Sequence, residues 1–449
     1  MKTTTFALLL LAAFSFSACQ KLTQTTSFTG NVPLYMSYDE LRTSISNDND
    51  RSLENPGKIV LYNDWILINE LEQGIHIYDN SNPAAPEHMA FISIPGNIDI
   101  AIQNGVLYAD SYVDLVALDL STPTAVEEIG RTENVFSYTI PTLNMDENYP
   151  VARIDQTKGV VIGYEVRDVE ETCEDQTCYH EYIIERSNDG WLGGGGLRQE
   201  ETTLTFGDGA ANVRSSASSP NSSIAGSMAR FLTVGEHLYA ISSEEEIKVF
   251  QLGNADPIEV NSFRPWDDAG RWGIIETLFR LNDNLFIGSN NGMLIYDVSS
   301  SNSPSYLSHY QHFTACDPVI ANNAYAFVTL RGGTECGWQE INELQALDVS
   351  NIMEPSLITT MGMDQPQGLT MDDGANLLFV CDGLSGIRTI DFADLENAQL
   401  PQLSQTTGFD AYDVILKDRR LHVIGSTGLM QFSYSEDGSL QEISTLDLR

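Results

Sequence analysis

Two short apolar runs, separated by a polar turn, recur along most of this chain. In the first copy, Trp65 to Ile68 is followed by a turn and by residues 74–79, an apolar run that ends in Asp79 and a Ser-Asn-Pro turn. Apolar runs of about four to eight residues between Gly, Asn, Asp, Ser or Pro are typical of buried β-strands. The copies begin at Trp65, Val106, His237, Asn284, Ala324, Leu377 and Arg420.

The spacing of the copies predicts the fold. Most begin about 40–50 residues apart, which is the length of a four-stranded propeller blade. A single blade cannot bury both of its faces, whereas blades stacked around an axis cover one another and leave only short edges. We therefore predict an all-β chain in which residues 57–449 form a single β-propeller of about seven four-stranded blades. A β-sandwich or two smaller barrels would not require seven copies of one unit.

One long insertion, residues 137–228, interrupts the repeat between the second and third copies. It contains two runs with strand composition, residues 159–166 and 179–185, with Cys173 and Cys178 between them. We expect a β-hairpin with a disulfide between these two cysteines near its tip. A Gly-rich stretch and a Ser-rich stretch follow and are typical of loops. The insertion is either a decoration of the propeller or a binding arm or lid.

The first residues predict an exported protein. Met1 and Lys2 precede an apolar run at residues 6–14, and Phe16-Ser17-Ala18-Cys19 follows. This is a secretory signal that ends in small residues. The cysteine resembles the lipidated residue of a bacterial lipobox, although an ordinary signal peptide with a chance cysteine is the alternative. We expect residues 1–18 to be a signal peptide, Cys19 to be lipidated, and residues 19–56 to be a polar tether with an edge strand near residues 32–36.

The charge of the chain is strongly acidic. It has 63 aspartates and glutamates against 23 lysines and arginines, a formal net charge of −40. Nucleic-acid binding requires a basic surface and is therefore disfavoured, so we expect no nucleic-acid partner. Electrostatic binding to anionic lipid is disfavoured for the same reason, so the predicted membrane contact is the lipid anchor alone. The acidity serves solubility or, as the sharper alternative, attracts cations or basic partners.

The repeat units resemble a known family. Residues 74–80, Gly-Ile-His-Ile-Tyr-Asp-Asn, and residues 344–350, Leu-Gln-Ala-Leu-Asp-Val-Ser, are similar to the LVIVD repeat of exported bacterial β-propeller proteins, which are often lipoproteins of Bacteroidetes. The resemblance covers residues 57–449 outside the insertion and implies a cell-surface propeller at the outer membrane. It implies no catalytic residues. The third and seventh copies lack the Asp-Val-Ser ending.

The blade topology predicts which residues share one end of the propeller. The fourth antiparallel strand of a blade ends where the next blade begins, so we expect the insertion to lie on that face. The long loop at residues 330–341 lies there too, and Cys316 and Cys336 are close enough in this arrangement to form a disulfide. Polar residues at the starts of the innermost strands are expected to ring the mouth of the central channel. These residues are Lys58, Asp99, Arg230, Glu276, Asp317 and Asp413. The alternative for this ring is solvated strand ends and salt bridges.

Catalytic motifs are not recognisable in the sequence. It contains no G-x-S-x-G elbow, P-loop or dinucleotide fingerprint, and no Cys/His set with zinc spacing. His309 and His312 lie three positions apart on an expected strand and therefore face opposite sides. His76 and His422 lie inside expected strands, and Cys381 is expected to be a buried thiol. Trp191 and Trp338, in expected loops, could stack on a sugar.

Two hypotheses for function follow. The first is a monomeric, non-enzymatic surface scaffold that binds a protein or glycan through the face with the insertion. It needs no cofactor. The second is a metal-dependent hydrolase or lactonase-like enzyme with an acidic site at the channel mouth. In that case Asp99, Glu276, Asp317 and Asp413 would bind a hard cation such as Ca²⁺.

Overall fold

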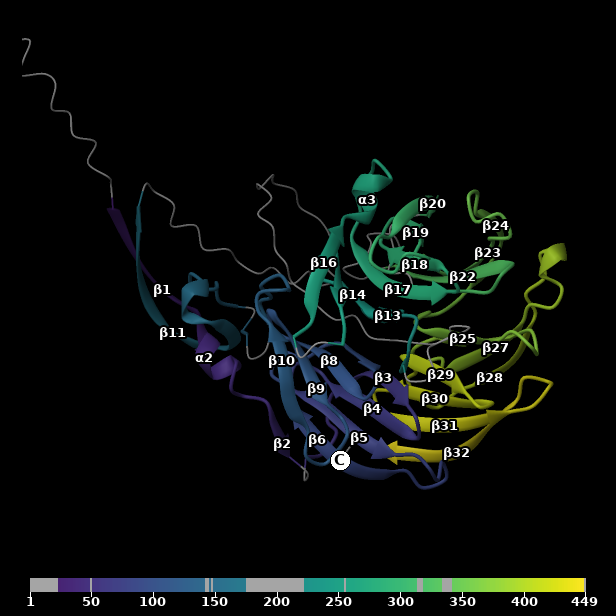
Figure 1. The fold of residues 1–449 in the computed structure, drawn as a ribbon, viewed down its shortest axis with the longest axis horizontal. Coiled ribbons are helices and arrows are strands. Elements are labelled where there is room, and N and C mark those ends of the chain that lie inside the picture. The colour runs from purple at the N-terminus through teal and green to yellow at the C-terminus, as the bar shows by residue number, and fades with distance from the viewer. Residues whose placement is uncertain are drawn as a thin grey trace, which may run out of the picture. The chain divides into compact units, whose positions relative to one another are not determined.

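The computed structural model describes residues 23–48, 51–141, 145–146, 148–174, 222–253, 256–312, 318–332 and 341–447. These residues form an almost entirely β structure (Figure 1). The chain divides into two compact units. One consists of Met1–Tyr38 with Ile140–Thr203, and the other of Asp39–Thr139 with Leu204–Arg449. Within the described ranges, no helix has the length and apolar character that crossing a membrane requires.

The second unit confirms the predicted seven-bladed propeller. Each blade contains four antiparallel strands that follow one another in the sequence, and in blade I two further short strands, at residues 46–48 and 224–225, extend the sheet at its two edges. Blade I contains β3 (Pro56–Tyr62), β4 (Trp65–Glu70), β5 (Gly74–Asp79) and β6 (Glu87–Ser93), and blade II contains β7 (Ile100–Gln103), β8 (Val106–Ser111), β9 (Asp114–Asp119) and β10 (Glu127–Thr132). Blade III contains β13 (Phe231–Val234), β14 (His237–Ile241), β15 (Ile247–Gln251) and β16 (Ile258–Phe263), and blade IV contains β17 (Ile275–Leu281), β18 (Asn284–Ser289), β19 (Gly292–Asp297) and β20 (Ser305–Gln311).

The last three blades follow the same order. Blade V contains β21 (Val319–Ala321), β22 (Tyr325–Arg331), β23 (Asn342–Asp348) and β24 (Ser356–Gly362). Blade VI contains β25 (Leu369–Asp372), β26 (Leu377–Cys381), β27 (Ile387–Asp391) and β28 (Gln402–Thr406), and blade VII contains β29 (Asp413–Lys417), β30 (Arg420–Gly425), β31 (Gly428–Tyr434) and β32 (Leu440–Asp447). Four short helical turns complete the described structure: α2 (Tyr38–Leu41), the 3₁₀ turn Gln156–Lys158, α3 (Pro265–Asp268) and the 3₁₀ turn Leu395–Asn397.

The repeated Asp-x-Ser ending has a local cause. The carboxylate of Asp79 accepts a hydrogen bond from the Ser81 amide at 2.8 Å, and Asp297 and Ser299 repeat this contact at 2.7 Å. An aspartate that caps its own backbone two residues later forms a turn, so each such strand stops at the Asp. The glycine that starts the third strand is also required, because a Cβ at Gly74, where φ is +145°, would lie 2.0 Å from the Ile92 carbonyl oxygen.

Apolar layers between neighbouring blades form the core. Blades I and VII close the ring through packing of Ile66, Ile68 and Leu61 against Ile415 and Ile424. A buried amide pair joins the same two blades, because Gln431 Nε2 donates to Asn80 Oδ1 at 2.8 Å and Asn80 Nδ2 donates to Gln431 Oε1 at 3.0 Å. Among the described residues, the propeller therefore closes by side-chain packing between blades whose four strands each come from one continuous part of the chain.

The first unit contains a two-stranded ribbon. Strand β1 (Thr23–Met36) pairs antiparallel with β11 (Val160–Glu174) along its whole length, from Thr23 opposite Glu174 to Met36 opposite Val160. The loop before β11 is fixed on Asn31, whose side chain donates to the carbonyls of Asp146 and Tyr149. Figure 1 shows β1 and β11 as one long curved pair of strands.

This ribbon differs from the expected hairpin and tether. The run expected at residues 159–166 is a strand, but the partner that the structure gives it is β1. The second run, residues 179–185, lies outside the described residues. The edge strand expected near residues 32–36 is part of β1. Residues 46–48 form β2 (Ser46–Asp48) on the outer edge of blade I, paired with β6, so much of the expected tether between residues 19 and 56 has regular structure. Thr, Val and Tyr in β1 suit a strand, a signal that the polar composition concealed.

Candidate functional site

The first strand of each blade lines the central channel. These seven strands contact one another in order, β3, β7, β13, β17, β21, β25 and β29, and β29 contacts β3 again. Of the residues predicted to ring the channel mouth, Lys58 and Glu276 lie near the starts of β3 and β17, Asp99 and Arg230 directly precede β7 and β13, and Asp413 begins β29. Asp317 lies outside the described residues. The five described residues therefore lie at one end of the channel.

Asp99 is at the centre of the contacts between these residues. Its Oδ2 accepts from Lys58 Nζ at 2.7 Å and from the Arg230 amide at 2.5 Å, while its Oδ1 accepts from the Ile100 amide at 2.7 Å. Only 2 % of the Asp99 side chain is exposed, against 16 % of the Lys58 side chain. One buried carboxylate thus connects the first strands of blades I, II and III.

Asp110, at the end of β8, supports Asp99 and was not predicted from the sequence. Its Oδ1 accepts from the Asp99 amide, the Ile98 amide and Asn97 Nδ2, all at 2.8–2.9 Å. Burial raises the pKa of Asp110 from 3.8 to about 6, against the lowering effect of the hydrogen bonds from Asp99 and Ile98. The sequence did contain a signal for Asp110, because this acidic residue falls within a run that the repeat pattern predicts to be a buried strand. We call Lys58, Asp99, Asp110, Arg230 and Asp413 the channel-end cluster.

The two cations of the channel-end cluster are held among these acids. Burial lowers the pKa of Arg230, and electrostatic interactions with Asp110, Asp99, Glu276 and Glu244 oppose that shift. Burial also lowers the pKa of Lys58, while the Asp99 carboxylate beside it acts to raise it. The predicted Glu276 therefore interacts with the cluster through Arg230. Both bases remain close to carboxylates, so each positive charge is partly neutralised where it is buried.

Asp413 differs from the other acids of the channel-end cluster. It is 1 % exposed, and its Oδ1 atom has no hydrogen-bond partner among the described residues. Burial raises the pKa of Asp413 well above its ordinary value, and Lys58 and the amides of Val414 and Ile59 only partly oppose this. A buried carboxylate with a free oxygen next to a lysine is a group that can accept or give a proton.

The chain itself runs through the channel beside this cluster. Residues 222–229, here called the channel segment, include β12 (Ile224–Ala225), which pairs with β3, the first strand of blade I. The Ser223 amide donates to the Ile102 carbonyl of β7, and the Ser223 hydroxyl accepts from the Ile102 amide. The Ala229 carbonyl accepts from the Leu278 amide of β17. The channel segment therefore lies against the first strands of blades I, II and IV, inside the ring that these strands form.

The last residues of the insertion, which belong to the channel segment, depart from the expectation that the insertion lies on one face of the propeller. The chain leaves blade II near Val135, which bonds Val113 at the end of the channel where Asp99 lies. After the described residues of the first unit and the undescribed residues 175–221, the chain is next described at Ser222, which pairs with Gln103 at the other end of β7. From there it runs back along the channel to Arg230. Strand topology fixes only where blade II ends and blade III begins. It could not predict that the connecting chain passes back through the channel.

A narrow recess lies where the channel segment meets the channel-end cluster. It is lined by Lys58, Asp99 and Asp413, by Ala225, Gly226, Met228 and Ala229 of the chain leading into blade III, and by Ile59 and Val60 of β3. Within the described residues, no three His, Cys, Asp or Glu side chains are grouped closely enough to hold a metal ion. Asp317 is outside this search, so the calcium site stays a prediction.

The predicted cysteines have different outcomes. Cys381 in β26 is a buried free thiol, as expected. Cys173 lies in β11, where the structure describes only its place in the strand. Cys19, Cys178, Cys316 and Cys336 lie outside the described residues, as do Trp191 and Trp338. Lipidation of Cys19 and both disulfides therefore stay predictions.

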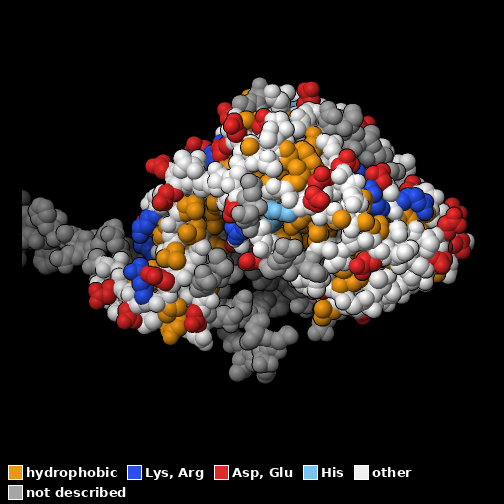
Figure 2. Space-filling model, turned by 90° about the horizontal axis from the view of Figure 1, so that it is seen from below, with side chains coloured by type: hydrophobic (Ala, Val, Ile, Leu, Met, Phe, Trp, Pro, Cys, Tyr) orange, Lys and Arg blue, Asp and Glu red, His pale blue; other side chains and the backbone are white. Residues whose placement is uncertain are grey.

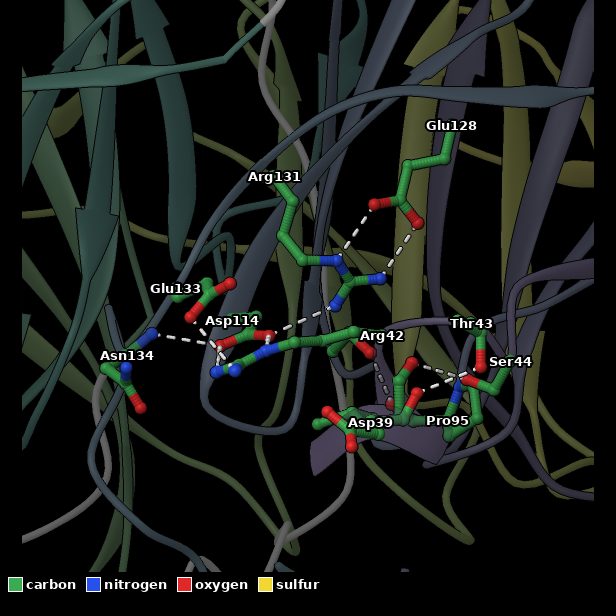
Figure 3. Close-up of polar contacts among 12 residues, drawn as sticks. Asp39, Arg42, Thr43, Ser44, Pro95, Asp114, Glu128, Arg131, Glu133 and Asn134 are labelled. Atoms are coloured by element: carbon green, nitrogen blue, oxygen red, sulfur yellow. Dashed lines mark hydrogen bonds and ion pairs between the residues drawn. The ribbon is translucent and has the colours of Figure 1, made fainter. Parts of the chain in front are cut away.

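A second group of charges surrounds the buried Asp114. This blade II ion cluster consists of Arg42, Asp114, Glu128, Arg131 and Glu133 (Figure 3). Asp114 Oδ2 is 3.0 Å from Arg42 Nε and 3.2 Å from Arg131 Nη1, and its Oδ1 accepts from the Asn134 amide at 2.9 Å. Glu128 and Glu133 bind the two arginines from the outside. This cluster attaches the segment after α2 to blade II.

The surface reflects the acidic composition. On the face drawn in Figure 2, aspartates and glutamates are spread over the surface, with few lysines and arginines between them. Acidic side chains distributed in this way favour solubility and give no single strongly charged patch on that face.

Comparisons with known proteins support the fold. No protein-family model matches the chain, and no curated protein matches it in sequence. A candidate 6-phosphogluconolactonase from Bacteroides fragilis aligns with a TM-score of 0.50 and 10% identity over 87% of this chain and 94% of that protein. A second such protein from Bacteroides uniformis aligns with a TM-score of 0.50 and 12% identity over 87% and 95% of the two chains. A periplasmic gluconolactonase from Pseudomonas aeruginosa has a TM-score of 0.50 and 9% identity over 88% and 97%. At these identities the similarity extends to the propeller fold alone.

Proposed function

We propose that this chain is a surface scaffold, attached to the bacterial outer membrane through a lipid on Cys19, that binds a protein or glycan partner. The observation that carries the proposal is the channel segment. A propeller that converts a small molecule in its channel needs an open cavity there. Here residues 222–229 run inside the channel and meet the channel-end cluster. This arrangement favours contacts on the outer surfaces of the molecule.

The ribbon of β1 and β11 supplies such a surface. Leu34 and Val166 are 40 % and 41 % exposed, respectively, although both are large apolar residues in regular strands. Exposed apolar side chains on paired strands provide contact area without a folding cost on binding. The ribbon also belongs to the unit that contains much of the insertion, for which a binding arm is one of the two sequence interpretations.

The partner experiment removes the whole first unit. The mature chain with Cys19→Ser is compared with a variant that joins Asp39–Thr139 to Leu204–Arg449 through a short Gly-Ser linker. Because β1 and β11 pair with each other, removing both strands does not leave one of them without its partner. Both proteins are screened on an array of bacterial and host glycans and crosslinked to outer-membrane proteins of the producing cells. We expect the shorter variant to keep the propeller's melting transition and to lose the partner.

A point variant gives the matched control. Leu34→Ser with Val166→Ser removes the exposed apolar groups and leaves the backbone pairing of the ribbon in place. We expect weaker partner binding with an unchanged melting temperature. Equal binding by the full chain and by the chain without its first unit would contradict a role for that unit.

The anchor is tested separately. Cells that express the full chain or Cys19→Ser are fed a labelled fatty acid and then fractionated. We expect label and outer-membrane location for the full chain, and neither for the variant. Release of both proteins in soluble form, without label, would contradict the lipid anchor.

A lactonase-like enzyme is the second candidate, and the free Oδ1 of Asp413 beside Lys58 favours it. The similarity to gluconolactonase propellers fits this candidate at the level of fold. The test measures acid release from gluconolactone and 6-phosphogluconolactone by the full chain and by Asp413→Asn. Hydrolysis that Asp413→Asn abolishes would replace the scaffold proposal. Hydrolysis at the buffer rate leaves the scaffold in place.

A further inference from the structure

We propose that His76 and His88 in blade I form a binding site for a divalent transition metal that prefers nitrogen ligands, such as Zn²⁺, Ni²⁺ or Cu²⁺. The site is independent of the channel and of the proposed scaffold function. It is carried by three observations: the distance between two imidazole nitrogens, a buried carboxylate behind one of them, and an exposed position for the other.

The two histidines come together because of a strand irregularity. His76 lies on β5 opposite Phe91 of β6, and the register shifts between Ile77 and Tyr78, which places His88 opposite Tyr78. His76 Nδ1 is 3.1 Å from His88 Nε2. Two nitrogens bound to one tetrahedral Zn²⁺, with bonds of about 2.0–2.1 Å, are about 3.3 Å apart. A small rotation of the His88 ring would therefore direct both lone pairs at one ion.

Glu70 supplies the outer support that metal-binding histidines usually have. Its carboxylate accepts from the amides of Glu54 and Asn55 at 3.1 and 2.7 Å, and its Oε2 is 3.5 Å from His76 Nε2. A carboxylate on this side keeps the proton of His76 on Nε2, which leaves the Nδ1 lone pair directed at His88. His76 Nε2 is buried and has no hydrogen-bond partner of ordinary length. A metal on Nδ1 would make Nε2–H a stronger donor and draw it toward Glu70.

The surroundings define the class of ion. His76 is fully buried, with its ring tilted against Phe91, whereas His88 is exposed and its ring lies edge-on to Tyr78. No third His, Cys, Asp or Glu of the described chain joins them, so water would complete the coordination. Two imidazoles and water suit Zn²⁺, Ni²⁺ and Cu²⁺, while Ca²⁺ and Mg²⁺ prefer oxygen ligands.

The metal test uses the mature chain with Cys19→Ser after dialysis against a chelator. Zn²⁺ binding is measured by calorimetry, and Cu²⁺ binding by electron paramagnetic resonance, which detects the number of coordinated nitrogens. We expect one ion per chain and a signal from two imidazoles. His88→Ala should remove this binding and keep the melting temperature of the metal-free protein, because His88 is exposed.

Two further variants separate this site from nonspecific binding. Glu70→Gln keeps both ligands but removes the carboxylate, and we expect about 10–100-fold weaker Zn²⁺ binding. His312→Ala removes a histidine that follows β20 in blade IV and should leave the affinity unchanged. Zn²⁺ affinity that is the same in His88→Ala as in the full chain, or a Cu²⁺ spectrum without two nitrogens, would overturn the proposal.

Discussion

The two buried ion clusters of the propeller differ in whether their acids are satisfied. In the blade II ion cluster, both oxygens of Asp114 have partners: two arginines on Oδ2 and a backbone amide on Oδ1. In the channel-end cluster, Asp99 is similarly satisfied, but Oδ1 of Asp413 has no partner among the described residues. The channel-end cluster also lines a narrow recess.

This difference separates a structural from a functional arrangement of charge. A buried ion group whose hydrogen bonds are complete holds segments in place, and removing one member leaves an unpaired charge. An unsatisfied buried carboxylate costs stability and is retained where it can bind or exchange a proton. The comparison predicts that variants of the first cluster affect folding, whereas those of the second affect pH dependence and chemistry.

The largest effect is expected for Asp114→Ala. This variant leaves Arg131, which is 9 % exposed, without its buried acid, and it leaves Arg42 with the exposed Glu133 as its carboxylate partner. Removal of one partner from a buried pair costs about 3–5 kcal/mol. Urea denaturation should show this loss in the free energy of unfolding, with an unchanged slope. A loss below about 1 kcal/mol would mean that the cluster is not structurally important.

The next largest effect is expected for Asp110→Asn, and it is a change in how the free energy of unfolding depends on pH. Its folded pKa is about 6 against an ordinary 3.8, so the folded state favours the protonated acid. Protonated Asp110 therefore adds to the free energy of unfolding below pH 4. This contribution, about 3 kcal/mol, is lost as the pH rises through about 6. Asp110→Asn keeps the side-chain oxygen that accepts from Asp99 and Ile98. In urea denaturation, the free energy of unfolding of this variant minus that of the unmodified chain should rise by about 3 kcal/mol from pH 4 to pH 7. Parallel pH profiles of the two proteins would contradict the raised pKa.

Asp413→Asn should show the same sign with a smaller net effect at neutral pH. Burial raises the pKa of Asp413, so its contribution to stability is also present below pH 4 and decreases at higher pH. Each unit of pKa shift is worth about 1.4 kcal/mol. The amide group that replaces the free oxygen remains unsatisfied and offsets part of that gain. Thermal denaturation should therefore show the variant to be more stable relative to the unmodified chain at pH 7 than at pH 4, by at least about 1 kcal/mol. A loss of stability that is equal at both pH values would show that Asp413 is ionised in the folded protein.

The sequence predicted the fold well because the repeat depends on local rules. The apolar pairs beginning at Trp65, Val106 and Asn284 are the central strands of their blades, and the Asp-x-Ser endings are capped turns. These features repeat at each blade, so an error at one copy does not change the result. The third copy lacks the aspartate, yet the Leu252 amide still bonds Glu236 and closes the same turn.

The site was less predictable because its contacts join residues far apart in the chain. Strand starts predicted that Lys58, Asp99 and Asp413 share one end of the channel. They could not predict which carboxylate Lys58 binds, that Asp110 supports Asp99 from a second strand, or that residues 222–229 return through the channel. The pairing of β1 with β11 joins residues more than a hundred positions apart, and no local pattern specifies that register.

The smallest effect is expected at the outer side of the blade II ion cluster, for Glu128→Gln. Glu128 binds Arg131 through two hydrogen bonds of 2.8 Å, but its side chain is 27 % exposed. Solvent screens such a pair, and Arg131 keeps Asp114, so the loss should be about 0.2–1 kcal/mol. Added salt should shrink it further. Denaturation of this variant and of Asp114→Ala at low and high salt therefore measures how the contribution of a charge changes from the surface to the interior of one cluster. A loss at Glu128 as large as that at Asp114 would show that the two glutamates, and not the buried aspartate, hold Arg42 and Arg131 in place.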